Sequence, residues 1–150
     1  MIVMTKCQQY EVYAAEEAVP TGAVFRDVTH AQAFVDGLRE TWWWERFYFA
    51  APARVEVYFR GGSMSLNGYD RAKDAGFIEL APGQRNVKTV LHELAHILAE
   101  VLFASHAHDP FFARTYAVLV YAVLGSRAWL TLQAGYERCG VDYMQNAKEE

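Results

Sequence analysis

The sequence contains little cysteine, no cluster of basic residues and no long hydrophobic run, and each shortage excludes a class of protein. Its two cysteines, Cys7 and Cys139, are far apart and form no CxxC pair, so we expect two reduced thiols rather than a disulfide or a cysteine metal site. The formal net charge is −4 and the basic residues are scattered, which makes nucleic acid an unexpected partner.

The apolar runs are too short to cross a membrane, so no membrane partner is expected. The first residues, Met1–Lys6, lack a basic stretch followed by an apolar one, so the sequence predicts no signal peptide and a cytoplasmic protein. What is present is a globular composition, with 53% hydrophobic and 15% aromatic residues in 150. Because there is no internal repeat and no low-complexity linker, we expect one domain over residues 1–150.

The first half of the chain predicts strands and one helix. A strand is predicted over Gln8–Ala14, ending before a polar turn at Glu16. Thr29 followed by Gln32 has the form of a capping box, which predicts a helix to about Trp42. Alternation and turn residues then predict strands at Arg54–Arg60 and Phe77–Leu80, separated by a loop at 62–75 rich in Gly, Ser, Asn and Asp.

The second half predicts three helices. Asn86 is a suitable N-cap for a helix to about Phe103, and Asp109-Pro110 has the form of an N-cap followed by proline at the first helical position. That helix should run to Leu124, and Ser126 should cap a last helix that ends near Gly140. Strands first and helices later indicate an α+β fold, with helices packed on a small sheet.

The most specific pattern is His92-Glu93-Leu94-Ala95-His96, an HExxH motif inside the helix that Asn86 should start. Two histidines four residues apart lie on one helix face and can hold one zinc ion, Zn2+. The glutamate between them is placed to act as general base on a metal-bound water. The motif therefore predicts a zinc-dependent hydrolase with Glu93 as its catalytic residue.

A turn of about 100° per residue places the remaining side chains of this helix on two arcs. One arc is apolar and should dock on a core: Ile97, Val90, Val101, Leu94, Val87, Leu98, Leu91, Leu102 and Ala95. The opposite arc carries Thr89, His92, Glu93, His96 and Glu100. A catalytic metal needs this arrangement, because it must be held by a rigid element and remain open to substrate.

The third metal ligand is expected beyond the motif helix. Ala99 and Leu102 stand where a metzincin would have glycine and histidine, and the helix after the motif has no acidic residue for a thermolysin-like ligand. The candidates are His108, which we favour, then His106; Asp109 is better suited to orienting a ligand histidine.

The motif together with His108-Asp109-Pro110-Phe111-Phe112 resembles the HExxH…HGPxF pattern of a family of small bacterial and bacteriophage metallohydrolases. Val12-Tyr13-Ala14-Ala15-Glu16, Trp42-Trp43-Trp44 and Gly140-Val141-Asp142 are similar to that family too, and the two-part pattern is similar to SprT-like zinc proteases. The resemblance implies a zincin-like fold, zinc ligands His92, His96 and His108, and Glu93 as base. Asp109 departs from the glycine of the pattern, and the cysteine-rich zinc ribbon of many SprT-like proteins is missing.

Three functional hypotheses follow. The first is a metallopeptidase, in which strand Phe77–Leu80, as an edge strand, pairs with an extended peptide or protein substrate. Tyr69, Tyr116 and Tyr143 are candidates to stabilise the oxyanion, although packing suits each of them better. The second is a non-catalytic zinc module that binds a partner protein through Trp42–Trp44, which cannot all lie on one side of a helix. The third is a regulatory protease that acts on a DNA-associated protein. The substrate and the oligomeric state do not follow from the sequence.

Overall fold

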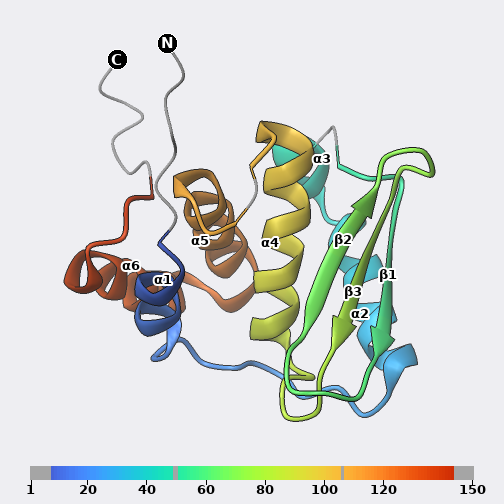
Figure 1. Cartoon of the computed structure of the whole chain (residues 1–150), viewed down its shortest axis with the longest axis horizontal. Helices are drawn as coiled ribbons and strands as arrows, with labels where there is room; N and C mark the ends of the chain where they lie inside the picture. The colour runs from blue at the N-terminus through green and yellow to red at the C-terminus, as the bar shows by residue number, and fades with distance from the viewer. Residues whose placement is uncertain (1–7, 49–50, 106, 144–150) are drawn as a thin grey trace.

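The computed structural model describes residues 8–48, 51–105 and 107–143, which form one mixed α+β domain (Figure 1). The expected α+β class is therefore confirmed. In chain order the elements are α1 (Gln9–Glu16), α2 (Val28–Arg39), α3 (Trp42–Tyr48), β1 (Arg54–Phe59), β2 (Leu66–Asp70), β3 (Ala75–Leu80), α4 (Val87–Phe103), α5 (Pro110–Leu124) and α6 (Ser126–Cys139). Among the described helices, none is long and apolar enough to span a membrane.

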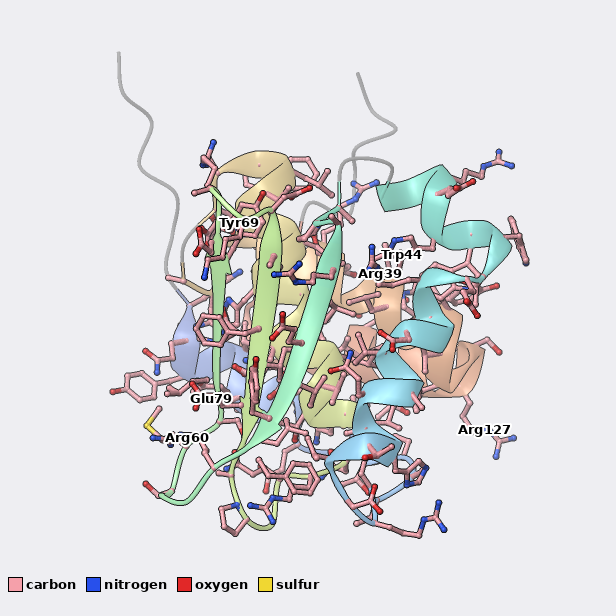
Figure 2. All side chains as sticks on the ribbon, turned by 90° about the vertical axis from the view of Figure 1, so that its right-hand side faces the viewer. Arg39, Trp44, Arg60, Tyr69, Glu79 and Arg127 are labelled. Atoms are coloured by element: carbon pink, nitrogen blue, oxygen red, sulfur yellow. The ribbon has the colours of Figure 1, made fainter. Side chains whose placement is uncertain are left out.

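The sheet has the strand order β1-β3-β2, with β3 parallel to β1 and antiparallel to β2. One face of the sheet packs on α4. The central strand β3 approaches α4 so closely that a Cβ atom on Gly76 would lie 3.1 Å from the Ile97 side chain. Buried Val57 and Ile78 lie side by side on that face. Figure 2 looks onto the other face, where Arg60 and Glu79 form an ion pair at 3.9 Å.

The sheet corrects two predictions of the sequence. Residues 62–75 do not form one loop, because β2 lies within them and pairs with β3. Strand β3 matches the predicted Phe77–Leu80 strand but is central, so the prediction of an edge strand there is wrong. The strand that was not predicted, β2, fits against β3 because Gly68 lies under the Phe77 ring, where a Cβ atom would be 2.3 Å from the ring. Strand β1 confirms the predicted strand from Arg54.

Helix α2 covers the edge of β1 through one side chain. Gln32 donates to the carbonyl of Val55 at 2.8 Å and accepts from the backbone N–H of Val57 at 2.7 Å. The predicted capping box is therefore wrong: Asp27 is the N-cap, and Gln32 serves the sheet instead. The helix also ends at Arg39 rather than near Trp42, which begins α3.

The tryptophans at 42–44 divide between core and surface, as their helical spacing predicted. Trp44 is buried, whereas Trp42 is 77% exposed. Trp42 and Trp43 line an apolar groove of about 630 Å³ together with Val118, Tyr121, Ala122 and Trp129. None of these residues belongs to the histidine site described below.

Helix α4 runs through the middle of the domain (Figure 1). Asn86 caps it as predicted, its side chain accepting from the N–H of Thr89 at 2.9 Å. The expected apolar arc packs against the sheet and α5; its residues are buried except Val101 and Leu102, which are partly buried. Part of the polar arc is covered as well: His92 and Glu93 are each only 7% exposed, because β2 and α5 pack on α4 and Glu16 of α1 bonds to His92, whereas Thr89, His96 and Glu100 are partly exposed.

The N-terminal segment is a helix rather than the predicted strand. In α1, Val12 and Ala15 are three residues apart and both buried, which is a helical spacing, and α1 packs on α6. The contact is close, since a Cβ atom on Gly135 would lie 2.3 Å from the carbonyl oxygen of Ala15. Buried Gln8 exchanges two hydrogen bonds with the backbone of Asp142, which ties the two ends of the domain together.

A sharp turn joins α4 to α5. Ala104 and Ala107 adopt positive φ angles, 53° and 78°, and reverse the chain so that His108 lies beside α4. Asp109 caps α5 as predicted, accepting from the N–H of Phe112 at 3.0 Å and from the Ser105 hydroxyl at 2.6 Å. Its φ is −79°, so this position does not need the conformational freedom of glycine.

The last helix begins and ends close to the predicted residues. Gly125 ends α5 and is also the residue before α6, while Gly140, at φ 73°, ends α6. The prediction that Ser126 caps this helix is wrong, because Ser126 is its first helical residue and no side chain caps it.

Candidate metal centre

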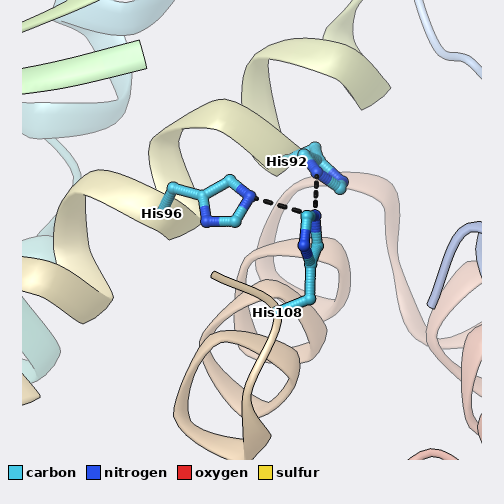
Figure 3. A group of neighbouring side chains, drawn as sticks. All are labelled: His92, His96 and His108. Atoms are coloured by element: carbon cyan, nitrogen blue, oxygen red, sulfur yellow. Dashed lines mark hydrogen bonds between the residues drawn. The ribbon is translucent and has the colours of Figure 1, made fainter. Parts of the chain in front are cut away.

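Three histidine side chains converge between α4 and the start of α5. Nε2 of His108 lies 3.2 Å from Nε2 of His96 and 3.3 Å from Nε2 of His92, as Figure 3 shows. His92 and His96 are one turn apart on α4, and His108 comes from the turn before α5. Among the described residues, these three form the group of histidine, cysteine or acidic side chains that can hold a metal ion.

The spacing of the nitrogens suits a tetrahedral metal ion. Two nitrogens at about 2.0–2.1 Å from zinc, separated by a tetrahedral angle, lie about 3.3 Å from each other. The two measured separations, 3.2 and 3.3 Å, agree with this value. Hydrogen atoms cannot satisfy three Nε2 atoms that all face one another, whereas a shared cation can.

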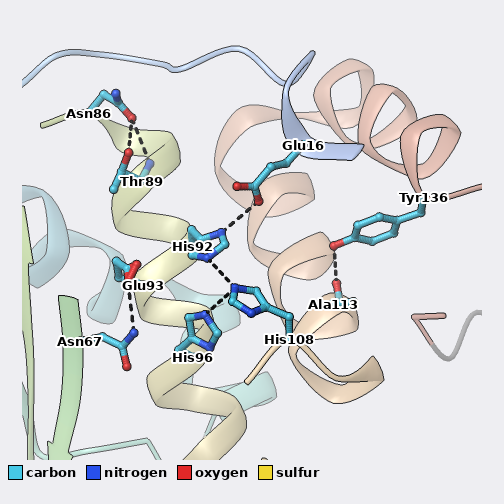
Figure 4. A network of polar contacts seen from close by, with 10 residues as sticks. All are labelled: Glu16, Asn67, Asn86, Thr89, His92, Glu93, His96, His108, Ala113 and Tyr136. Atoms are coloured by element: carbon cyan, nitrogen blue, oxygen red, sulfur yellow. Dashed lines mark hydrogen bonds and ion pairs between the residues drawn. The ribbon is translucent and has the colours of Figure 1, made fainter. Parts of the chain in front are cut away.

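Glu16 of α1 fixes the orientation of His92. Its carboxylate accepts a hydrogen bond from Nδ1 of His92 at 2.9 Å, and both side chains are largely buried (Figure 4). A proton held on Nδ1 leaves Nε2 with a lone pair, which points at the other two histidines. The sequence predicted a polar turn at Glu16 and contains no local signal of this role.

Burial keeps two of the three imidazoles neutral. Desolvation, with a contribution from the charge of His92, lowers the pKa of His96 to about 2 and that of His108 to about 4. Burial also acts to lower the pKa of His92, but the charge and hydrogen bond of Glu16 outweigh it, and the pKa is raised. Neutral imidazole is the form that binds metal ions, so His96 and His108 are ready for binding at neutral pH.

Glu93 follows His92 on α4, about 100° further around the helix, and bonds towards β2, whereas His92 bonds towards α1. Its carboxylate accepts a hydrogen bond from the side-chain amide of Asn67 at 3.1 Å (Figure 4). Burial raises the pKa of Glu93, while His92 and Asn67 act to lower it. A raised pKa makes the carboxylate a stronger base. Asn67 lies in a segment that was predicted to be a loop, so the sequence contained no signal of this contact.

Aromatic rings enclose the three imidazoles. Phe112 of α5 stacks on His96 with a centroid distance of 4.1 Å. Tyr13 of α1 stacks on His92 at 5.7 Å and meets His108 edge-on at 5.1 Å. These contacts restrict the rotation of all three imidazoles, so the site is arranged before any metal ion arrives.

A pocket of about 370 Å³ opens beside His92 and Glu93. Helix α1 forms one wall and the segment before β2 forms another, with the first turns of α4 between them. The lining residues are Tyr13, Glu16, Met64, Ser65, Gln84, Lys88, Thr89, His92 and Glu93.

Several other candidates from the sequence have different positions. Asp109 does not orient a ligand histidine; its carboxylate caps α5, and Glu16 orients His92 instead. His106 lies outside the described residues. Glu100 is not part of the group that can hold a metal ion.

The three tyrosines considered for the oxyanion are engaged in packing or in other contacts. The Tyr69 hydroxyl donates to Asp74 at 2.7 Å. Tyr116 is fully buried with its ring against His92 at 5.6 Å, and the Tyr143 ring packs on Tyr136 at 4.8 Å. Tyr13, which was not among the residues predicted for the active site, is the tyrosine that lines the pocket.

Comparisons of the chain with family models, curated proteins and solved structures give no match. The resemblance to small HExxH proteins therefore stays a prediction. What the structure defines is a mixed α+β protein in which three neighbouring histidines can bind a metal ion.

Proposed function

We propose that this protein is a zinc-dependent hydrolase that cleaves peptide bonds, with a zincin-like site. The observation that carries the proposal is the convergence of three histidine Nε2 atoms beside a buried glutamate that lines an open pocket. The donor set of three imidazoles is that of a catalytic zinc site, which keeps one position for water or substrate.

In the proposed mechanism Glu93, Asn67 and Glu16 have separate roles. When bound, zinc supplies a Lewis acid and lowers the pKa of water. Glu93 takes a proton from the attacking water and delivers it to the leaving amine. Asn67 donates a hydrogen bond to the Glu93 carboxylate, and Glu16 holds His92 in the tautomer that leaves Nε2 free.

An extended substrate suits the edge of the sheet. Gln32 covers the outer edge of β1, but β2 is the other edge strand and lies next to Glu93 through Asn67. A peptide added to β2 by backbone hydrogen bonds would therefore pass close to the catalytic carboxylate. This role was expected for the strand at Phe77–Leu80, but that strand is central in the sheet, so we propose β2 for the role instead.

The alternative, a non-catalytic zinc module, has less support. A structural zinc site is usually closed by four protein ligands, whereas three potential ligands gather here among the described residues. A structural site also gives no reason for a carboxylate with a raised pKa beside an open pocket. Both features favour catalysis.

The test combines metal content with activity on a mixed peptide library. Zinc-loaded wild-type protein should cleave peptides, and Glu93→Gln should keep its zinc but lose activity by about a hundredfold or more. His108→Ala should lose zinc, whereas His30→Ala, in α2, should retain both zinc and activity. Unchanged cleavage by Glu93→Gln would reject the proposal.

A further inference from the structure

The pocket beside the histidine site contains a lysine side chain, that of Lys88. One helical turn before His92, Lys88 lines the same pocket as His92 and Glu93. Its side chain is half-buried and shares the pocket with Glu16 of α1, and both Glu16 and Glu17 act on its charge. Lys88 is therefore placed to meet a substrate group that lies next to the bond cleaved at the metal.

The other polar side chains at this end of the pocket are already engaged. The Thr89 hydroxyl donates to the Asn86 side chain at 3.1 Å. The Gln84 side-chain oxygen accepts from both the N–H and the hydroxyl of Ser65, at 3.1 and 2.6 Å. These bonds hold Gln84, Ser65 and Thr89 in place in the wall of the pocket.

Lys88 differs from these groups. Within the described residues, its ammonium group forms neither a hydrogen bond nor an ion pair. Burial lowers the pKa of Lys88, as is expected for an amine that has lost part of its hydration without gaining a close partner. Glu16, the nearest buried carboxylate on α1, is engaged with His92.

The charges around the pocket favour an anion at this position. A bound divalent zinc ion would balance the carboxylates of Glu16 and Glu93. Glu17 also acts on Lys88, but it is exposed and forms no ion pair with Lys88 among the described residues, so no direct contact neutralises the charge of Lys88. An incoming carboxylate would neutralise it, whereas an incoming cation would be repelled. A neutral side chain would leave the ammonium group without a partner.

We propose that Lys88 is a specificity-determining residue that binds the carboxylate of a substrate Asp or Glu next to the scissile bond. This proposal rests on the proposed peptidase function, because it assumes that the ligand of the pocket is a peptide substrate. The pocket, its cation and the position next to His92 are properties of the structure alone.

Binding measurements separate this inference from catalysis. The probes are three tripeptide hydroxamates that chelate the metal and differ in one side chain beside the chelating group, which is Glu, Gln or Lys. They are titrated calorimetrically into the full-length, zinc-loaded Glu93→Gln protein, which does not cleave them. We expect the Glu probe to bind about three- to tenfold more tightly than the Gln probe, as for a partly buried ion pair.

The variants Lys88→Gln and Lys88→Glu are made in the same background. Lys88→Gln should abolish the preference for Glu, and Lys88→Glu should reverse it in favour of the Lys probe. The matched control is Lys73→Glu, which makes the same charge change in the exposed turn between β2 and β3 and should leave the preference intact. Thermal unfolding of each variant verifies that it is folded.

Equal binding of the Glu and Gln probes, a preference that survives Lys88→Gln, or no binding of any probe would each overturn the inference. A mixed peptide library incubated with the active wild-type protein gives the second readout. Cleavage without any preference among the probes overturns the Lys88 proposal and leaves the peptidase proposal standing. A Lys88-dependent preference without any cleavage supports the Lys88 proposal and overturns the peptidase proposal.

Discussion

The carboxylate of Glu16 lies 2.9 Å from Nδ1 of His92, although 76 positions of sequence separate the two residues. The contact joins the first described helix to the central one and decides which imidazole nitrogen faces the proposed metal. It also makes the metal centre depend on how α1 packs, because α1 is held by α6 and by a hydrogen bond from the Gln8 N–H to the His108 carbonyl.

Removing this carboxylate should weaken metal binding without removing a ligand. We expect Glu16→Ala to lower zinc affinity about 10- to 100-fold, as is typical when the partner of a ligand histidine is lost. Glu16→Gln keeps an acceptor for Nδ1 and should fall between Ala and wild type. Competition with a chromophoric chelator measures the affinity. The control is Glu17→Ala, in the exposed neighbour, and equal affinities of the two alanine variants would contradict the assigned role.

Asn67 should set the pH at which the proposed base becomes active. Its amide stabilises the ionised form of Glu93, so Asn67→Ala should raise the pKa of Glu93 and shift the acid limb of kcat/KM to higher pH. Asn67→Asp adds a like charge and should shift the limb further in the same direction. Steady-state rates between pH 4 and 8 on a cleaved library peptide provide the profile. A limb that does not move in either variant would show that Asn67 does not act on the base.

The close approach of α1 to α6 should link stability to metal binding. In Gly135→Ala the new methyl group would meet the Ala15 carbonyl at 2.3 Å, so α1 must shift. We expect a loss of about 1–3 kcal/mol in the free energy of unfolding, together with weaker zinc binding as Glu16 moves. Gly37→Ala, where a Cβ meets nothing within 4 Å, should stabilise the protein by up to about 1 kcal/mol. Urea unfolding measures the stability of both variants and zinc titration measures their affinity. Unchanged zinc affinity in Gly135→Ala would contradict the predicted link between the α1–α6 contact and metal binding.

The metal-free protein should lose stability as the pH falls below about 6.5, the usual pKa of histidine. His96 and His108 have lowered pKa values, about 2 and about 4, so the unfolded chain binds protons that the folded chain excludes. His92 and Glu93, whose pKa values are raised, act in the opposite direction and reduce the slope. Urea unfolding in a chelator from pH 4.5 to 7.5 measures the slope. His96→Leu should flatten it and His30→Leu should not; identical slopes in wild type and His96→Leu would refute the explanation.

The parts of the fold that the sequence predicted well depend on neighbouring residues. Asn86 and Asp109 cap their helices as expected, because an N-cap bonds to a backbone N–H three residues ahead. The HExxH spacing likewise places His92 and His96 on one side of α4 through the pitch of the helix alone. These features need no partner from elsewhere in the chain.

The missed elements depend on contacts far apart in the sequence. Strand β2 contains Asn67 and Gly68, which are poor strand formers, and it exists because it pairs with β3 and lies under the Phe77 ring. Helix α1 was predicted as a strand, since its tyrosines and valine suit either element until α6 packs on it. The Gln32 side chain bonds to β1 rather than completing a capping box, because the strand edge offers it both a donor and an acceptor.

By itself, the sequence therefore determined the α+β class, the motif helix and the candidate ligands His92, His96 and His108. Only the tertiary structure decided that Nε2 of His108 lies 3.2 Å from that of His96 and 3.3 Å from that of His92. It also decided that Glu16 orients His92 and that Asn67 bonds to Glu93. The physical reason is that helix pitch and capping act over a few residues. Hydrogen bonds to a buried imidazole or carboxylate, in contrast, come from whichever segment packs against it.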